Sequence, residues 1–210
     1  KSIASTAKTT LNTVRLNMQK WLVLVLLKGT FGGSSDTVLE KMRGLIDDRS
    51  VSKIAFPYNF IKTNYLNKAG VAELIVTSTD IDGYVKTKKK DAFPILSLLC
   101  PKINTTDVFD IDHLHSKKKC QDQPKGSDAH EKYDLLPNLT RQEPSVNRQK
   151  GDEDLDSWYN NSWIKTSWPH LGRVGTPDAL LLKDASGLLP LNIADFADYY
   201  ARREQILRDK

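Results

Sequence analysis

The sequence predicts an α+β protein that is mainly helical. In the N-terminal half, apolar residues recur at spacings of three and four, which is the periodicity of amphipathic helices. Near residue 108 a short run of strand-forming residues follows, bounded by polar segments. Helical periodicity returns at the C-terminal end. We therefore expect a small strand-containing segment set between two helical regions.

The N-terminal half accounts for four expected helices. The first spans residues 4–27 and ends at Gly29, because glycine readily adopts the backbone conformation that stops a helix. The second runs to residue 46 after Ser35 and Asp36, side chains that cap exposed backbone amides. Two short helices are expected over residues 70–76 and 92–100.

The second half is expected to begin with a strand at Val108, Phe109 and Ile111. A loop over residues 115–129 follows, and we expect its part rich in Lys, Gln and Asp, roughly residues 116–127, to be exposed and mobile. The remaining expectations are a returning strand over 133–140, helices over 144–150 and 152–159, a helical turn at 176–178, and a last amphipathic helix capped by Asn192 and Asp195.

Composition narrows the class of protein. The chain has 210 residues, 39% of them hydrophobic and 27% charged, as in an ordinary globular protein of one large domain or two small ones. Its net charge of +5 favours an anionic partner such as nucleic acid, although many unrelated proteins share it. The only long apolar run, residues 21–27, is far shorter than the roughly 18 residues of a membrane span, so no membrane partner is expected.

Cysteine usage and the chain start indicate the compartment. Cys100 and Cys120 lie far apart and form no C-x-x-C pair, which argues against a structural zinc knuckle and against a disulfide framework. No signal peptide is visible. The chain begins with Lys1 instead of methionine. We expect a cytoplasmic fragment of a longer protein.

The strand near residue 110 carries the first chemical signal, the sequence Asp110-Ile111-Asp112-His113. Strand alternation places Asp110 and Asp112 on one face and turns His113 to the other side or into the following turn. The carboxylate of Asp112 is a hard oxygen ligand suited to Mg²⁺ or Mn²⁺. A neutral His113 is suited to take a proton from water.

Two asparagines provide the second signal. Asn138 and Asn147 flank the expected turn from the returning strand into the helix over 144–150. An asparagine on the helix can lend its side-chain oxygen to the same cation as Asp112. An asparagine at the strand can hydrogen-bond the backbone and hold the loop that carries the histidine.

Together, D-I-D-H at 110–113, N-L-T-R at 138–141 and N-R-Q-K at 147–150 resemble the HNH (His-Me finger, ββα-metal) endonucleases, including the HNH domains of RNA-guided CRISPR nucleases. The resemblance implies a mainly helical protein with an embedded ββα-metal core over residues 106–165. A helical region over 1–105 would precede this core, and a helical region over 166–210 would pack on it. The implied activity is single-metal hydrolysis that nicks DNA.

Residue roles follow from the resemblance. His113 would be the general base, and Asp112 and Asn147 would bind Mg²⁺ or Mn²⁺. Asn138 would belong to the catalytic site as the asparagine that stabilises its loop. Asp110 would contact the metal ligands without binding the metal itself.

The flanks widen the resemblance beyond the motif. Q-K-W-L at 19–22, F-P-I-L-S-L-L at 93–99 and Y-A-R-R at 200–203 are similar to the C-terminal half of GmrSD-type modification-dependent restriction proteins and of the related SspE proteins of phosphorothioate-linked phage defence. The implied partners are DNA and an N-terminal NTPase-like domain of the same full-length protein. This chain would then be the nuclease module of a bacterial defence system.

Two departures from the family concern His115 and the cysteines. Many relatives have proline where His115 stands, so His115 is open to three interpretations: a substrate contact, an extra ligand beside the metal, or an exposed turn histidine. Zinc-stabilised HNH domains have cysteine pairs that this sequence lacks.

Basic residues near the motif are candidate DNA contacts. Arg141, Arg148 and Lys150 are expected to bind phosphates, with ion pairs to Asp152 or Glu153 as the ordinary alternative. The lysine runs at 86–90 and 117–119 fit phosphate contacts and solvated loops almost equally. Two other functions remain open: a catalytically inactive nucleic-acid-binding or regulatory module, and a helical protein–protein adaptor with a coincidental motif.

Overall fold

The computed structural model describes residues 2–30, 35–47, 56–57, 59–61, 76–99, 109–161 and 180–210. The chain divides into two compact units, Lys1–Ser78 and Thr79–Lys210. The domain boundaries expected at residues 105 and 165 both fall within the second unit. The helix expected over 70–76, except for Val76, and the turn expected at 176–178 lie outside the described residues.

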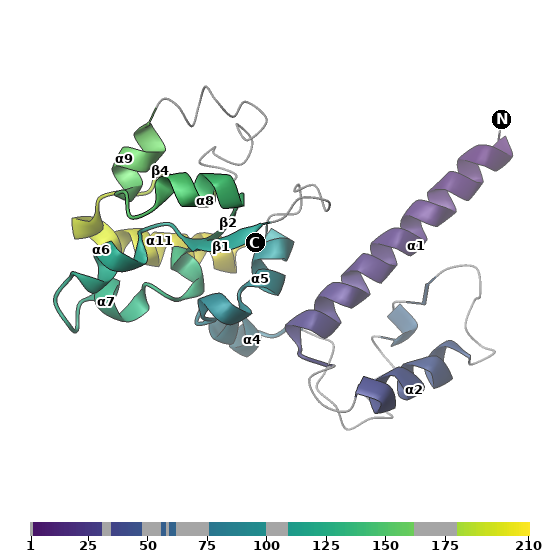
Figure 1. Cartoon of the computed structure of the whole chain (residues 1–210). Coiled ribbons are helices and arrows are strands. Elements are labelled where there is room, and N and C mark those ends of the chain that lie inside the picture. The colour runs from purple at the N-terminus through teal and green to yellow at the C-terminus, as the bar shows by residue number, and fades with distance from the viewer. Residues whose placement is uncertain are drawn as a thin grey trace. The chain divides into compact units, whose positions relative to one another are not determined.

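The first unit contains α1 (Ser2–Leu27) and α2 (Ser35–Ile46), which confirms both expected helices (Figure 1). Helix α1 ends where Gly29 adopts φ 59°, and the amide of Thr30 returns to the carbonyl of Val25 at 2.9 Å, a common glycine-dependent helix stop. Among the described helices, none is both long and apolar enough to cross a bilayer.

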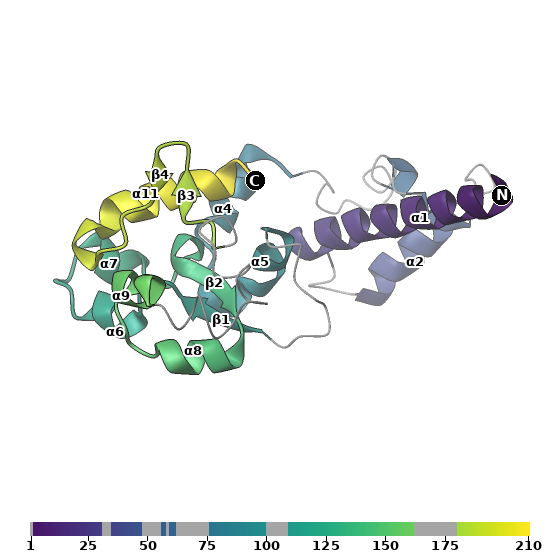
Figure 2. The ribbon, with the colours of Figure 1, turned by 90° about the horizontal axis from the view of Figure 1, so that it is seen from above.

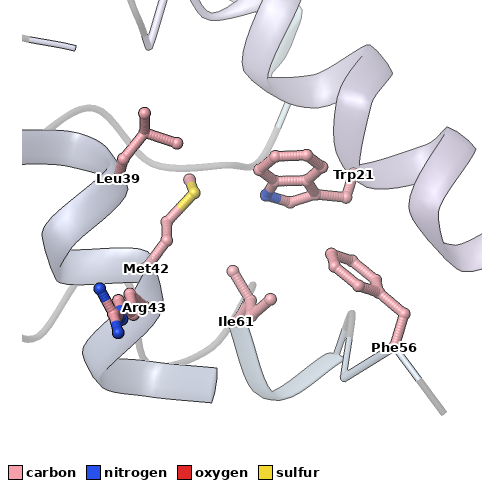
Figure 3. A pocket seen from close by; sticks show the side chains of 6 residues that line it. All are labelled: Trp21, Leu39, Met42, Arg43, Phe56 and Ile61. Atoms are coloured by element: carbon pink, nitrogen blue, oxygen red, sulfur yellow. The ribbon is translucent and has the colours of Figure 1, made fainter. Parts of the chain in front are cut away.

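A small apolar core joins the two helices of the first unit. Its buried residues Val25, Val38, Met42 and Ile61 pack beside a cavity of about 350 Å³. Figure 3 shows the side chains around this cavity, which are Trp21, Leu39, Met42, Arg43, Phe56 and Ile61. Arg43 is the one ionisable group among these lining side chains, so the cavity offers no acid–base pair.

The second unit opens with three short helical elements: α4 (Ser78–Tyr84), the 3-10 helix η1 (Lys89–Asp91) and α5 (Phe93–Leu99). Helix α5 confirms the helix expected over 92–100. Its buried residue Leu96 packs in a cluster with Leu136 and Leu139, which are far along the chain, and with Leu207 near the C-terminus.

The hairpin consists of β1 (Asp110–His113) and β2 (Leu139–Gln142), which pair antiparallel with Asp112 opposite Thr140 and His113 opposite Leu139. The returning strand was expected over 133–140, and this boundary is wrong. Pro137 lies in a 3-10 helix, η2 (Leu136–Asn138), which precedes the strand. Proline has no amide hydrogen to donate to a ladder, so pairing begins only after it.

The segment between the strands was expected to be a loop, and the structure corrects this. It forms α6 (Lys117–Gln121) and α7 (Asp128–Lys132). Ser116 caps the first helix by accepting from the amide of Lys119 at 3.2 Å, and Ser127 caps the second in the same way. Cys120 and Ala129 are buried, so each short helix is anchored by an apolar side chain.

After β2 the chain continues into α8 (Pro144–Lys150), which matches the expected helix at both ends, and α9 (Leu155–Asn160). Pro144 stands in the first turn, where its missing amide hydrogen costs no bond. The last part forms a second small hairpin and the C-terminal helix: β3 (Lys183–Asp184), β4 (Gly187–Leu188), η3 (Ile193–Asp195) and α11 (Phe196–Arg208). Asn192 and Asp195 were expected to cap the last helix. Asn192 accepts from the amide of Ala194 at 2.9 Å and thereby caps η3, whereas Asp195 occupies the N-cap of α11 without a side-chain cap hydrogen bond.

The fold class is therefore confirmed as mainly helical α+β, with two small two-stranded antiparallel sheets in the described residues. Figure 2 shows β1 and β2 between α8 and α11. Helix α11 is joined to the hairpin by Arg203, which is 1% exposed and donates hydrogen bonds to the carbonyls of Pro137, Leu139 and Leu180. The hairpin is thus supported on one side by α11 and contacted on the other by α8.

Candidate active site

The two aspartates of β1 face helix α8. The amide nitrogen Nδ2 of Asn147 donates to Oδ2 of Asp110 at 3.2 Å, and Nζ of Lys150 donates to Oδ2 of Asp112 at 2.9 Å. Asn147 and Lys150 are three residues apart in α8 and therefore lie on one face of it. Groups 37 and 38 residues apart in the sequence are brought together here.

Lys150 is placed differently from the expectation. Its side chain is 1% exposed, against 13% for Asp112, and it also donates to the backbone carbonyl of His113. Its ammonium lies 5.8 Å from the centre of the Trp158 ring. Lys150 therefore points into the protein and not toward solvent. Its positive charge neutralises Asp112 within the fold.

Asn147 was expected to share a cation with Asp112, with Asp110 behind them. In the structure the direct hydrogen-bond partner of Asn147 is Asp110. Asp112, two residues along the same strand face, has Lys150 as its partner. The three oxygen-bearing side chains thus line one surface between β1 and α8, with Asp110 closer to Asn147 than the sequence indicated.

His113 ends β1 and has a different partner. Its Nε2 lies 3.0 Å from Oδ1 of Asp134, and its ring centre is 5.8 Å from that of Tyr133. The side chain is 7% exposed, and burial lowers the pKa of His113 below its ordinary value of 6.5. The hydrogen bond to the carboxylate of Asp134 raises this pKa, and the charge of Lys89 lowers it further. Burial therefore favours the neutral imidazole, which is the form able to accept a proton.

Sequence reasoning did not find Asp134. It falls inside the segment expected as the returning strand, and no motif spacing marks it. The contact exists because α6 and α7 connect β1 to β2 and return the chain toward β1. This return brings Asp134 next to His113.

Asn138 is fully buried and ties two segments together. Its side-chain oxygen accepts from the amide of His115 at 2.9 Å. Its Nδ2 donates to the carbonyl of His115 at 3.0 Å and to that of Tyr133 at 2.9 Å. The first segment directly follows His113 and the second directly precedes Asp134, so one carboxamide holds the backbone on both sides of the histidine–aspartate pair.

His115 lies in the core and is not an exposed turn residue. It is 2% exposed, with its ring edge-on to Tyr199 at 4.5 Å and to Phe196 at 5.3 Å between centres. Burial, followed by the charges of Lys150 and Arg203, lowers the pKa of His115 to about 3. The side chain is a neutral packing element between the hairpin and α11.

The two arginines differ in exposure. Arg148 is exposed on α8 beside Asn147. Arg141 is half-buried, and its guanidinium carbon lies 4.6 Å from the ring centre of Phe109 and 5.4 Å from that of Phe93. Arg148 is thus the more accessible phosphate candidate.

One lysine run lies beside the candidate base. The amide of Lys89 donates to the carbonyl of Asp134 at 3.1 Å, and Lys88 forms a β-bridge with Leu135. Lys86, Lys88 and Lys90 are exposed. In the other run, Lys119 is paired with Asp154 at 3.3 Å, whereas Lys117 and Lys118 are exposed.

No protein-family model and no curated protein matches this chain. The function is therefore inferred from the chemistry of the described residues.

The donor set between β1 and α8 fits a hard divalent cation. In the part of the chain that the structure describes, no group of three histidine, cysteine, aspartate or glutamate side chains could hold a metal. The set between β1 and α8 is of a different kind, because it combines the carboxylates of Asp110 and Asp112 with the carboxamide of Asn147. Oxygen donors of this kind suit Mg²⁺ and Mn²⁺. Asn147 donates through Nδ2 and Lys150 binds Oδ2 of Asp112, so the side-chain oxygen of Asn147 and Oδ1 of Asp112 are the atoms that would bind a cation.

Proposed function

We propose that this chain is a metal-dependent DNA endonuclease of the HNH (ββα-metal) type that hydrolyses one strand of a duplex. The observation that carries the proposal is the packing of α8 against β1, the first strand of the hairpin. Two carboxylates and a carboxamide lie between this strand and the helix, and a histidine whose pKa is lowered by burial ends the strand. These are the groups that phosphodiester hydrolysis requires.

Asp112 and Asn147 would hold the cation, with Asp110 beside them. When bound, Mg²⁺ or Mn²⁺ supplies positive charge where the phosphoryl and departing oxygens become more negative. Asp110 orients Asn147 through their 3.2 Å hydrogen bond. Lys150 holds the carboxylate of Asp112 in one orientation from inside the protein.

His113 would accept the proton of the attacking water. Its burial lowers the pKa of the ring and so favours the neutral form, which is the state a general base needs. Asn138 fixes the backbone that follows His113, so the ring has a defined position relative to β1. A defined position lowers the entropic cost of reaching the reactive geometry.

DNA binding is assigned to exposed basic residues near the site. Arg148 lies on α8 next to Asn147, and the exposed lysines 86, 88 and 90 belong to the segment that is hydrogen-bonded to Asp134. Contacts from such residues to phosphates make affinity depend steeply on salt. Lys150 is left out of this set because it is buried.

The wider context rests on the resemblance in sequence alone. On that basis we propose a cytoplasmic nuclease module of a longer bacterial restriction or anti-phage protein. An NTPase-like domain of the same protein would act with it on DNA.

A second candidate is a catalytically inactive nucleic-acid-binding module. The observation in its favour is the buried Lys150, whose ammonium neutralises Asp112 without a metal ion. In such a module the lysine would take over the structural role of a cation. DNA binding would persist without cleavage.

Plasmid nicking separates the two candidates. We expect Mg²⁺ or Mn²⁺ to support conversion of supercoiled plasmid to the open circular form, and a chelator to stop it. His113→Ala should lower the nicking rate by about 100-fold or more, the effect of losing a general base, while gel-shift affinity for DNA is retained.

The matched control is His130→Ala, which removes a histidine from α7 in the same unit. Nicking by this variant should equal that of the unaltered protein. DNA binding without any metal-dependent nicking in the unaltered protein would favour the inactive module. Equal nicking by His113→Ala would remove His113 as the base.

A further inference from the structure

The carboxylate of Asp134 lies within hydrogen-bonding distance of the His113 ring, and the reaction proposed above gives it no role. Its Oδ1 lies 3.0 Å from Nε2 of the ring. A neutral imidazole carries one N–H and one acceptor nitrogen, and an ionised carboxylate only accepts. The contact therefore places the hydrogen on Nε2 and leaves the lone pair on Nδ1.

Asp134 is held in place from several sides. Its carbonyl accepts from the amide of Lys89 at 3.1 Å, and the next residue, Leu135, forms a bridge with Lys88. On the other side, Asn138 binds the carbonyl of Tyr133 at 2.9 Å. The side chain of Asp134 is 37% exposed, so it is supported through its backbone more than through packing.

The same asparagine joins this segment to the one that carries the histidine. Asn138 binds both the amide and the carbonyl of His115, two residues after His113. A shift of Asp134 relative to His113 would therefore have to break buried hydrogen bonds. Groups arranged in this way are preorganised, because little reorganisation is needed at the moment of reaction.

We propose that Asp134 is a positioning residue that fixes the orientation and tautomer of His113, so that Nδ1 is the nitrogen that accepts the proton from water. This inference rests on the proposed nuclease function for its chemical step. The water oxygen forms a bond to phosphorus, its proton moves to Nδ1, and the bond from phosphorus to the 3′ oxygen breaks. The departing oxygen takes a proton from solvent. The hydrogen on Nε2 stays in the bond to Asp134 throughout.

The first test is spectroscopic and needs no activity. The ring nitrogens of ¹⁵N-histidine-labelled full chain report the tautomer of His113 at a pH where the ring is neutral. We expect the Nε2–H form in the unaltered protein, loss of that preference in Asp134→Ala, and its return in Asp134→Glu, which restores a carboxylate. The Nδ1–H form in the unaltered protein would overturn the assignment.

The second test is kinetic. Asp134→Ala should lower kcat for nicking by about 10- to 100-fold, the usual cost of losing a group that orients a catalytic histidine, with KM nearly unchanged. Asp134→Glu should recover part of the loss. Glu131→Ala is the matched control, since it removes an exposed carboxylate of equal charge three residues away, and it should leave kcat unchanged.

Three outcomes overturn the positioning role: an unchanged tautomer in Asp134→Ala, an unchanged kcat, or a higher kcat, which would mean that the carboxylate blocks the base. If the unaltered protein does not nick at all, the nuclease function fails while the tautomer measurement still decides whether Asp134 orients His113. Circular dichroism and thermal unfolding verify that each variant is folded.

Discussion

Two histidines only two residues apart have different chemistry because their surroundings differ. The ring of His113 lies 3.0 Å from the carboxylate of Asp134, which orients it. His115 lies against Tyr199 and Phe196, with the charges of Lys150 and Arg203 disfavouring its protonated form. Nothing in the residue type separates the two; burial and neighbouring charge do.

The low pKa of His115 has a consequence for acid stability. Its folded pKa of about 3 lies below the ordinary value of 6.5, so between these pH values the unfolded chain binds a proton that the folded chain does not. Stability from this residue is fully present above pH 6.5 and is lost as pH falls toward 3. The loss is up to about 1.4 kcal/mol per pH unit.

His115→Phe tests this prediction, since phenylalanine has an aromatic ring without a titrating nitrogen. Urea unfolding at several pH values between 4 and 7 gives the slope of the unfolding free energy against pH. We expect a shallower slope in the variant, whatever its absolute stability. Identical slopes would show that His115 takes up its proton in the folded protein as readily as in the unfolded chain.

At the scale of elements, α8 is joined to β1 by polar contacts as well as packing. Asn147 and Lys150 reach Asp110 and Asp112 from one helix face, and Lys150 is almost completely buried. Removing one partner of a buried ion pair is costly because the other charge remains without compensation. Lys150 therefore holds the helix against the strand that bears the candidate ligands.

Lys150→Met should lower the unfolding free energy by about 3 kcal/mol, because it keeps the length of the side chain and leaves Asp112 without its countercharge. Thermal or urea unfolding measures the change. In this variant Mg²⁺ or Mn²⁺ should raise Tm more than in the unaltered protein, since a cation can then balance Asp112.

Gln149→Met is the control on the same helix, at an exposed position. It should change stability by no more than about 0.5 kcal/mol. Equal stability of Lys150→Met and the unaltered protein would mean that the ion pair with Asp112 contributes nothing to holding α8.

At the scale of the whole molecule, the candidate site belongs entirely to the second unit. The buried clusters around Tyr199 and around Leu139 lie within that unit, as do all the hydrogen bonds that position His113 and Asn138. Its two ends are joined, since Arg208 near the C-terminus pairs with Asp82 at 2.6 Å. The second unit thus has its own apolar core and an ion pair between its first and last helices.

A shortened chain of residues 76–210 should therefore fold cooperatively and keep metal-dependent nicking within about a factor of three of the full chain, an energy difference below about 1 kcal/mol. Circular dichroism, urea unfolding and the plasmid assay measure this. A chain that unfolds without cooperativity, or that folds without nicking while the full chain nicks, would assign the first unit a necessary role.

Local features of the structure could be predicted from the sequence because they depend on neighbours along the chain. The helical periodicity before Leu27, Pro144 at the start of α8 and the cap at Asn192 each involve residues within a few positions of one another. The strand boundary at Leu139 was missed although Pro137 is a local signal against pairing. The two short helices α6 and α7 were missed because helices of this length depend on tertiary packing.

By itself the sequence determined the helical character of the chain, the strand with its two aspartates and terminal histidine, and the spacing of Asn138 and Asn147. Only the tertiary structure decided the partners of these groups: Asp134 beside His113, Lys150 turned inward onto Asp112, and His115 within the core. The physical reason is that burial and pairing across 21 to 38 residues depend on how the chain returns on itself. The spacing of residues along the sequence does not predict which distant segments come into contact.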